Sequence, residues 1–241
     1  MRYRLVCLDA GFTLLAPRRT LTDALRGVLA EHGHEVTEED LHRAWEVADR
    51  WFWDDYHRPM SDTWADDARI DATWRQYHSL MLEELGLEDE RHQLIDTILA
   101  AQYAPDSWEL YPDVLLAVGE LRAAGVRLGI LSDWGSNLLP IIEGLGLTTE
   151  LDFVIASGAV GVAKPDPAFF RLAAARAGVP PGESLMVGDS IRADVEGARS
   201  AGMDAILIRR PEWRDRRRPV PEGVQVVASL AELPPIVLGE G

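Results

Sequence analysis

Three short apolar runs that each end at a polar residue constrain the fold more than any other feature of this chain. The runs are residues 5–8, 128–131 and 185–187, followed respectively by Asp9, by Ser132, and by Gly188 with Asp189. Short continuous apolar runs of this kind are typical of strands that are buried on both faces, as in parallel sheets. We therefore expect buried parallel strands whose carboxyl ends carry polar side chains.

Helical patterns separate these runs. Apolar residues spaced by three and four positions begin after Pro112 and end before Gly125, and a second helical segment begins at Ile191 and ends before Gly202. Proline near the start and glycine just past the end are typical of helices. The alternation of strands and helices predicts an α/β fold, a doubly wound parallel sheet that binds its ligands at the carboxyl edge.

Residues 16–106 have a wholly helical pattern. Their apolar stripes at helical spacing lie in residues 21–29, 41–52, 70–81 and 94–99. Thr20 and Thr37 are expected N-caps, each with an aspartate three residues later. We expect a four-helix cap domain at residues 16–106, inserted into a core domain of residues 1–15 and 107–241. Its aromatic residues follow the helical spacing, so we interpret them as the core of the cap.

The composition limits the partners of the protein. A formal net charge of −16 at pH 7 repels a phosphate backbone, so we expect no nucleic-acid partner. The arginines of residues 209–218 lie among prolines, and we interpret this segment as a solvated loop. No run reaches the ~18 apolar residues of a membrane span, and no signal peptide is visible. We expect a cytoplasmic protein without a membrane partner, as a monomer or a homodimer.

Polar residues with complementary chemistry follow the expected strands in chain order. They are Asp9 in LDAGFTL, Ser132 in ILSDWGSN, Lys164 in GVAKPDPAFF, and the pair Asp189 and Asp194 in VGDSIRADVEGARSAGM. At one sheet edge they would supply a carboxylate nucleophile, a hydroxyl and an ammonium for a phosphate, and carboxylates for a hard cation. Lys164 is the only lysine among 24 basic residues, and a compact ammonium can contact a carboxylate and a phosphoryl oxygen together.

In this order the segments resemble the sequence motifs of the haloacid dehalogenase (HAD) superfamily, from Leu5 to about Ile208. GDS-x-x-x-D and KPDP-x-x-F are specific forms of two motifs, whereas DAGFTL is a degenerate form of the first. The position of the helical insertion resembles the C1-type cap of the superfamily's phosphatases, phosphonatases and dehalogenases. The resemblance implies a hydrolase with a Rossmann-like core. The cap contains no lysine, which excludes a phosphonatase that depends on a cap-lysine Schiff base.

By this resemblance the protein would be a Mg²⁺-dependent phosphohydrolase that acts on a small phosphorylated metabolite through an aspartyl-phosphate. Asp9 would be the nucleophile, and it would hold Mg²⁺ together with Asp189 and the backbone carbonyl of Gly11. Ser132 and Lys164 would bind the phosphoryl oxygens. The remaining implied roles are a hydrogen bond near the nucleophile from Thr13 and a contact with metal-bound water or with Lys164 from Asp194.

Gly11 departs from the family pattern, because most phosphatases of the superfamily have there a second aspartate that acts as general acid and base. Loss of a positioned acid typically costs ~100- to 10,000-fold in rate. Either the leaving group of the substrate needs little protonation, or the acid comes from elsewhere, with Asp133 and His57 as candidates. The metal ligand expected at this position is a backbone carbonyl, which glycine retains.

Two other functions stay open. A 2-haloacid dehalogenase would use Asp9 to displace halide from carbon, with neither a metal nor an acid at Gly11. Dehalogenases usually have an aromatic residue at that position and a fourth motif without metal, whereas VGDSIRAD has the metal-binding form. A non-catalytic or regulatory protein would also lack the acid, but the other positions are intact.

Further substrate contacts are candidates at three places. Asp133 is a candidate substrate ligand, although we interpret it more readily, with Asn137, as a cap of the helix that follows Ser132. Arg18, where the chain enters the cap, is a candidate clamp for an anionic substrate. Residues 57–60, between two cap helices, are a candidate for part of the substrate contact.

Overall fold

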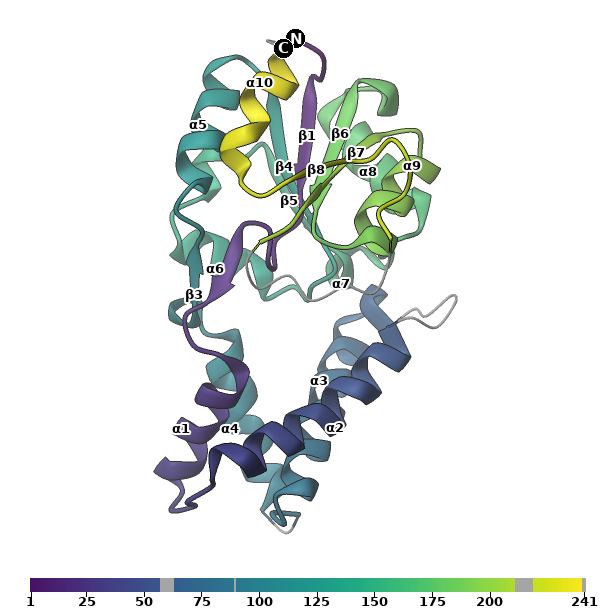
Figure 1. Ribbon diagram of the computed structural model, residues 1–241. Helices are drawn as coiled ribbons and strands as arrows, with labels where there is room; N and C mark the ends of the chain where they lie inside the picture. Colours follow the sequence, from purple (N-terminus) through teal and green to yellow (C-terminus); the bar gives the residue numbers. More distant parts are fainter. Residues whose placement is uncertain (57–62, 89, 211–218, 240–241) are drawn as a thin grey trace.

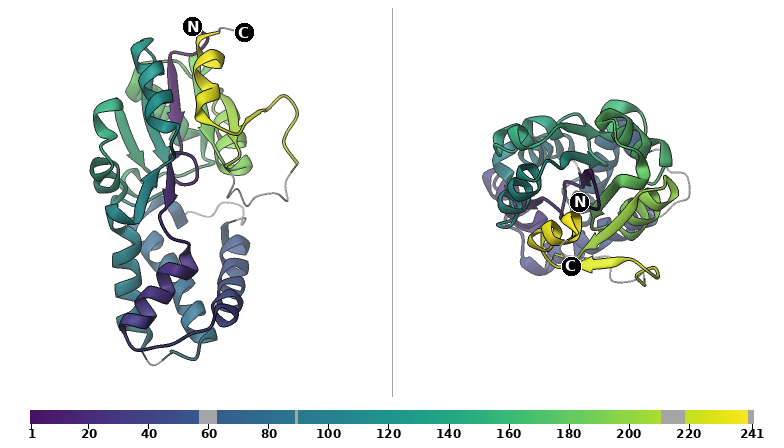
Figure 2. Two further views of the ribbon diagram at one scale, coloured as in Figure 1. Left: turned by 60° about the vertical axis from the view of Figure 1, so that its left-hand side comes forward. Right: turned by 90° about the horizontal axis from the view of Figure 1, so that it is seen from above.

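The computed structural model describes residues 1–56, 63–88, 90–210 and 219–239 of the chain. The molecule is elongated: an α/β part at one end carries both chain termini, and the helices α1–α4 form the other end (Figures 1 and 2). His57, the candidate contact at residues 57–60, and the arginines of residues 211–218 lie outside the described residues.

A parallel sheet forms the centre of the α/β part, as the sequence predicts. In the described residues its order is β5-β4-β1-β6-β7-β8. Its strands are β1 (Leu5–Leu8), β4 (Arg127–Ser132), β5 (Phe153–Ala156), β6 (Ser184–Gly188), β7 (Asp204–Ile208) and β8 (Gln225–Val227). Strand β1 pairs in parallel with β4 on one side and with β6 on the other, so these three carboxyl ends lie next to one another.

Helices cover both faces of this sheet (Figure 1). Val6 and Leu8 of β1 pack with α5 (Val114–Ala123), α6 (Leu138–Gly144) and α10 (Leu233–Leu238). Leu5 and Cys7, which point to the other face, pack with α8 (Pro167–Ala177) and α9 (Gly197–Ser200). The alternation along β1 follows from the two-residue period of a strand, and it produces the doubly wound arrangement.

The helices of the other end have a core of their own. They are α1 (Leu21–Glu31), α2 (Glu38–Tyr56), α3 (Asp67–Glu84) and α4 (Arg91–Tyr103). Leu25, Leu41, Met81 and Leu94, one from each helix, are almost fully buried in this core. The expected N-caps are formed. The Thr20 hydroxyl accepts the backbone N–H of Asp23 at 3.1 Å, and the Thr37 hydroxyl accepts that of Asp40 at 3.1 Å. In the described residues, no helix has the length and apolar content needed to cross a bilayer.

A short antiparallel ladder joins the helical end to the α/β part. Strand β2 (Leu15–Pro17) pairs with β3 (Trp108–Leu110), so the chain enters and leaves the helical end side by side. The sequence pattern predicts only helices in residues 16–106 and does not predict β2, because a strand of three residues is too short to show a period. The domain boundaries proposed from the sequence fall at this ladder.

A second contact connects the two ends away from the ladder. Asp67, in the first turn of α3, accepts hydrogen bonds from the backbone N–H of Ser136 at 2.9 Å and from the Ser136 hydroxyl at 2.5 Å. Gly158, in the short helix α7 (Ser157–Val160), lies so close that an added Cβ would be 2.2 Å from the Asp67 carboxylate. Helix α3 thus docks on the loop that follows β4.

Candidate active site

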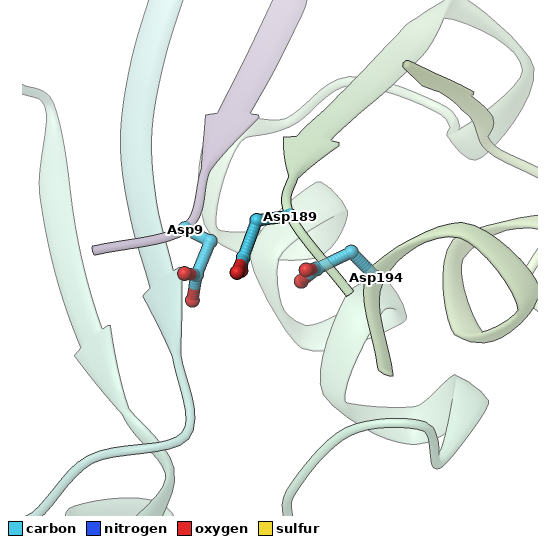
Figure 3. Close-up of side chains that lie close together, drawn as sticks. All are labelled: Asp9, Asp189 and Asp194. Carbon is cyan, nitrogen blue, oxygen red and sulfur yellow. The ribbon is translucent and has the colours of Figure 1, made fainter. Parts of the chain in front are cut away.

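Side chains from four segments converge at the carboxyl edge of the sheet. Asp9 directly follows β1, Ser132 ends β4 and Asp189 directly follows β6. Lys164 comes from the loop before α8. Because β1 lies between β4 and β6, Asp9 lies between Ser132 and Asp189 along the edge of the sheet. Figure 3 shows Asp189 between Asp9 and Asp194, with the three carboxylates turned toward one another.

The carboxylate of Asp9 is held by two donors. The Ser132 hydroxyl donates to Asp9 Oδ1 at 2.9 Å, and Lys164 Nζ donates to the same oxygen at 2.6 Å. Lys164 Nζ also donates to Asp194 Oδ1 at 2.6 Å. Only 2% of the Lys164 side chain is exposed, against 12% for Asp9, so a reactant reaches Asp9 first. In the described part of the chain, both side-chain hydrogen bonds to Asp9 go to Oδ1, which leaves Oδ2 to act as nucleophile.

Three carboxylates lie around one ammonium group near Asp9, and this excess of negative charge suits a divalent cation. Carboxylate oxygens of Asp9, Asp189 and Asp194 lie within 4.8 Å of one another. Burial, with the charge of Asp9, raises the pKa of Asp194 to about 6 and that of Asp189 well above its usual range. Burial lowers the pKa of Lys164, but Asp194 and Asp9 outweigh this effect and raise it overall. Clustered oxygen ligands with excess negative charge fit Mg²⁺.

Gly188 and a turn of π-helix allow Asp194 to approach this cluster. The segment Ile191–Glu196 is π-helical and is followed by α9, instead of the single α-helix that the sequence predicts. Ser190 donates its backbone N–H to Asp194 Oδ2 at 2.9 Å. A Cβ at Gly188 would lie 2.2 Å from the Asp194 carboxylate, so only glycine fits there. Single π-turns are frequent at functional sites.

The loop after Asp9 folds back on itself. The N–H groups of Leu14 and Leu15 both donate to the carbonyl of Ala10 at 2.9 Å, and Phe12 adopts a left-handed φ of 55°. Thr13 is fully buried, but in the described residues its hydroxyl has no hydrogen-bond partner, so the contact near the nucleophile expected for Thr13 is not formed. The backbone of this loop is instead fixed by its own hydrogen bonds, including that from the Phe12 N–H to the Leu15 carbonyl, and by a bridge between Gly11 and Leu15.

Arg210 fixes this loop. The sequence pattern indicates a solvated loop at Arg210, but this residue is 6% exposed. It donates to the Thr13 carbonyl at 2.8 Å, forms two hydrogen bonds to Asp113 at 2.7 and 2.9 Å, and stacks 4.0 Å above the Tyr111 ring. Burial raises the pKa of Asp113, but Arg210 and Ser229 outweigh it and lower the pKa overall. The one available signal was position, because Arg210 closely follows the apolar run of β7.

Asp133 does not cap the helix that follows it. Its Oδ1 accepts the backbone N–H of Lys164 at 2.9 Å, and Asn137 precedes α6 without a side-chain cap bond, so this interpretation was wrong. Asp133 Oδ2 is buried and has no partner in the part of the chain that the structure describes. Burial raises the pKa of Asp133 to about 7. Asp133 thus positions the loop of Lys164.

Replacement of Asp133 by Asn is expected to flatten the pH dependence of stability between about pH 4 and 7. The folded-state pKa of about 7 lies above the ordinary 3.8, so this stabilisation is complete below pH 3.8 and is lost as the pH rises through 7. Asn keeps an acceptor for Lys164 but cannot ionise. Urea unfolding in EDTA should show that the wild type loses more stability than the variant, by on the order of a few kcal/mol. Equal pH slopes would contradict this ionisation.

Arg18 is not brought into the group around Asp9. Its guanidinium pairs with Glu109 across the β2–β3 ladder at 3.0 Å, and about half of each side chain is exposed (52% and 49%). An exposed pair of this kind contributes little to stability. A role as substrate clamp stays a prediction.

The similarity to known sequences decides the family. The sequence model of a hydrolase family, described as haloacid dehalogenase-like hydrolase, matches residues 3–202. The chain belongs to the haloacid dehalogenase-like hydrolase family. The resemblance of the sequence motifs to this superfamily is confirmed, and with it the expectation of a hydrolase.

Relatives in the HAD-like family span different chemistries. The human haloacid dehalogenase-like hydrolase domain-containing protein 3 is 30% identical over 247 residues, which cover 98% of this chain and 94% of the relative. A phosphoserine phosphatase of Thermus thermophilus is 39% identical over 137 residues, 56% of this chain and 51% of the relative. The crystal structure of a 2-haloacid dehalogenase from Pseudomonas syringae is 27% identical with a TM-score of 0.64, covering 99% of both chains.

Proposed function

We propose that this HAD-like hydrolase is a Mg²⁺-dependent phosphohydrolase that acts on a small phosphorylated metabolite through an aspartyl-phosphate. One observation carries the proposal: Asp9 Oδ1 is held by Ser132 and Lys164 while the carboxylates of Asp189 and Asp194 lie beside it. A fixed nucleophile, donors for phosphoryl oxygens and a cation site are the parts that phosphoryl transfer requires.

The residues of the chain have separate tasks in this reaction. Asp9 Oδ2 attacks the phosphorus, and Ser132 and Lys164 donate to the phosphoryl oxygens as these approach. Asp189, Asp9 and the carbonyl of Gly11 would hold Mg²⁺, which supplies charge neutralisation for the phosphoryl group. Asp194 has both oxygens engaged, by Lys164 and by Ser190, so we assign it to positioning the ammonium.

Dehalogenation is a second candidate because position 11 lacks an acid and because the P. syringae dehalogenase is similar over its whole length. Displacement of halide by Asp9 would need no proton donor. The acidic pair Asp189 and Asp194 argues against it, since two further carboxylates beside an anionic substrate repel it unless a cation is bound. Metal dependence separates the two reactions, and silence in both assays would favour the non-catalytic alternative.

Mg²⁺ is expected to be required for phosphate release and to stabilise the fold. Phosphate release from p-nitrophenyl phosphate and acetyl phosphate should stop in EDTA. A halide-release assay on 2-haloacids, run in parallel, tests for dehalogenation. A ligand at 100 times its Kd stabilises by about 2.7 kcal/mol, so the melting temperature should rise with Mg²⁺. Asp189→Asn should remove this rise, whereas Asp106→Asn, at an exposed aspartate away from the site, should keep it. Halide release that survives EDTA would contradict the proposal.

A further inference from the structure

Trp134 occupies the direction in which a side chain at position 11 would point. A Cβ added to Gly11 would lie 3.4 Å from Cζ3 of the Trp134 ring. That separation is ordinary van der Waals contact, so the ring borders the space beside position 11. The place that the family's acid would take, beside the leaving group, is therefore walled by an aromatic ring in this chain.

Both the backbone and the ring of Trp134 are held by neighbouring residues. The backbone N–H of Trp134 donates to the Ser157 hydroxyl at 3.1 Å, and its carbonyl accepts the N–H of Gly158 at 3.0 Å. Its ring packs edge-to-face on Trp108 with centroids 4.9 Å apart. Trp108 is itself anchored by its own ring N–H, which donates to the carbonyl of Gln102 at 2.9 Å. A ring supported in this way is a fixed surface and not a mobile side chain.

The same indole keeps groups that a ligand can use. Trp134 is only partly buried, so part of the ring is accessible. Among the described residues, the hydrogen bonds of Trp134 are all made by its backbone and none by its Nε1–H. Aromatic rings pair favourably with one another in offset or edge-to-face geometry, beyond the area they bury. The ring thus offers a planar aromatic group a surface on which to pack.

The absence of an acid at position 11 also favours an aromatic leaving group. Without a donor at position 11, an alkoxide must leave almost unprotonated, whereas the oxide of a phenol, with a pKa near 10, leaves far more readily. We propose that the substrate is an aryl phosphate monoester whose ring packs on Trp134, a proposal that rests on the phosphohydrolase function above. Trp134 is then the specificity-determining residue of the site.

The reaction balances without a protein acid. Asp9 Oδ2 forms a bond to phosphorus as the bond from phosphorus to the aryl oxygen breaks, and the aryl oxide leaves with the electron pair. Water then attacks the phosphorus, the bond to Asp9 breaks, and the carboxylate is regenerated. The water gives one proton to the solvent and the aryl oxide takes one from it, so phenol and phosphate are the products.

The test compares phenyl phosphate, an alkyl phosphate and acetyl phosphate, with Mg²⁺ present. Acetyl phosphate has a good leaving group without a ring. The wild type should hydrolyse phenyl phosphate about 100- to 10,000-fold faster than the alkyl phosphate in kcat/KM. Trp134→Leu keeps apolar bulk and should lower the ratio of phenyl to acetyl phosphate about two- to tenfold through KM, whereas Trp134→Phe should keep it. This ratio cancels any loss of folded enzyme.

The outcomes of this test separate the aryl phosphate inference from the phosphohydrolase function. Equal rates for phenyl and alkyl phosphate, or a ratio that Trp134→Leu leaves unchanged, would overturn the aryl phosphate inference while the phosphohydrolase stands. Phosphate release from none of the three compounds would contradict the phosphohydrolase itself and the inference with it.

Discussion

Asp9→Asn should lower kcat for phosphate release by about 10³- to 10⁶-fold, since it replaces the attacking carboxylate by an amide of the same size. Ser132 and Lys164 can still donate to the amide oxygen, so the geometry of the site is retained. Initial rates with acetyl phosphate, the compound least dependent on an acid, would measure the loss.

The control for this variant is Asp106→Asn, which removes one negative charge from the exposed surface. It should have the wild-type rate. Asp9→Asn also removes a charge from a crowded group of carboxylates, so the variant should melt at a temperature no lower than that of the wild type in EDTA. Full activity of Asp9→Asn would show that the nucleophile has been wrongly assigned.

Arg210→Met should lower the free energy of unfolding by about 3–5 kcal/mol, the usual loss when one partner of a buried ion pair is removed. Met fills the volume above Tyr111, but it leaves the Thr13 carbonyl and the partly buried Asp113 carboxylate without the guanidinium, so that Asp113 keeps only Ser229 and Leu230 as donors. Because the pKa of Asp113 is lowered in the folded state, its stabilisation is present above the unfolded value and is lost as the pH falls through the folded one. Urea unfolding at pH 7 measures the difference.

Arg171→Met provides the matched control, because Arg171 is exposed on α8. It should change stability by less than about 0.5 kcal/mol. The double variant Arg210→Met with Asp113→Asn should recover part of the loss, since the amide carries no charge and its oxygen can still accept from Ser229 and Leu230. A loss below about 1 kcal/mol in Arg210→Met would contradict the importance of this pair.

The sequence predicts the centre of the fold well because local and long-range signals coincide there. The run from Leu5 to Leu8 is a strand with the bounds expected, since continuous apolar residues and the adjacent Asp9 mark it at both ends. The convergence of Asp9, Ser132 and Asp189 then follows from one rule, that parallel strands bring their carboxyl ends to the same edge. No knowledge of packing was needed for either prediction.

Other contacts have no local signature. Arg210 and Thr13 are 197 positions apart, and no local pattern near Arg210 predicts this contact. The aspartate at position 133 resembles a helix cap by its place after a strand, yet it accepts the N–H of Lys164, 31 positions later. The indole at position 134 is likewise placed over Gly11 by tertiary packing alone. Such pairs become visible only once the topology brings their segments together.

The contact of Asp67 with Ser136 has a consequence for the loop that carries Trp134. Ser136 belongs to the same short loop as Trp134, four residues after Ser132. Separation of α3 from the loop that follows β4 would break both hydrogen bonds to Ser136. The helical end and the loop that carries Trp134 are thus joined directly through Asp67, while Trp134 has its own contacts with Ser157 and Trp108.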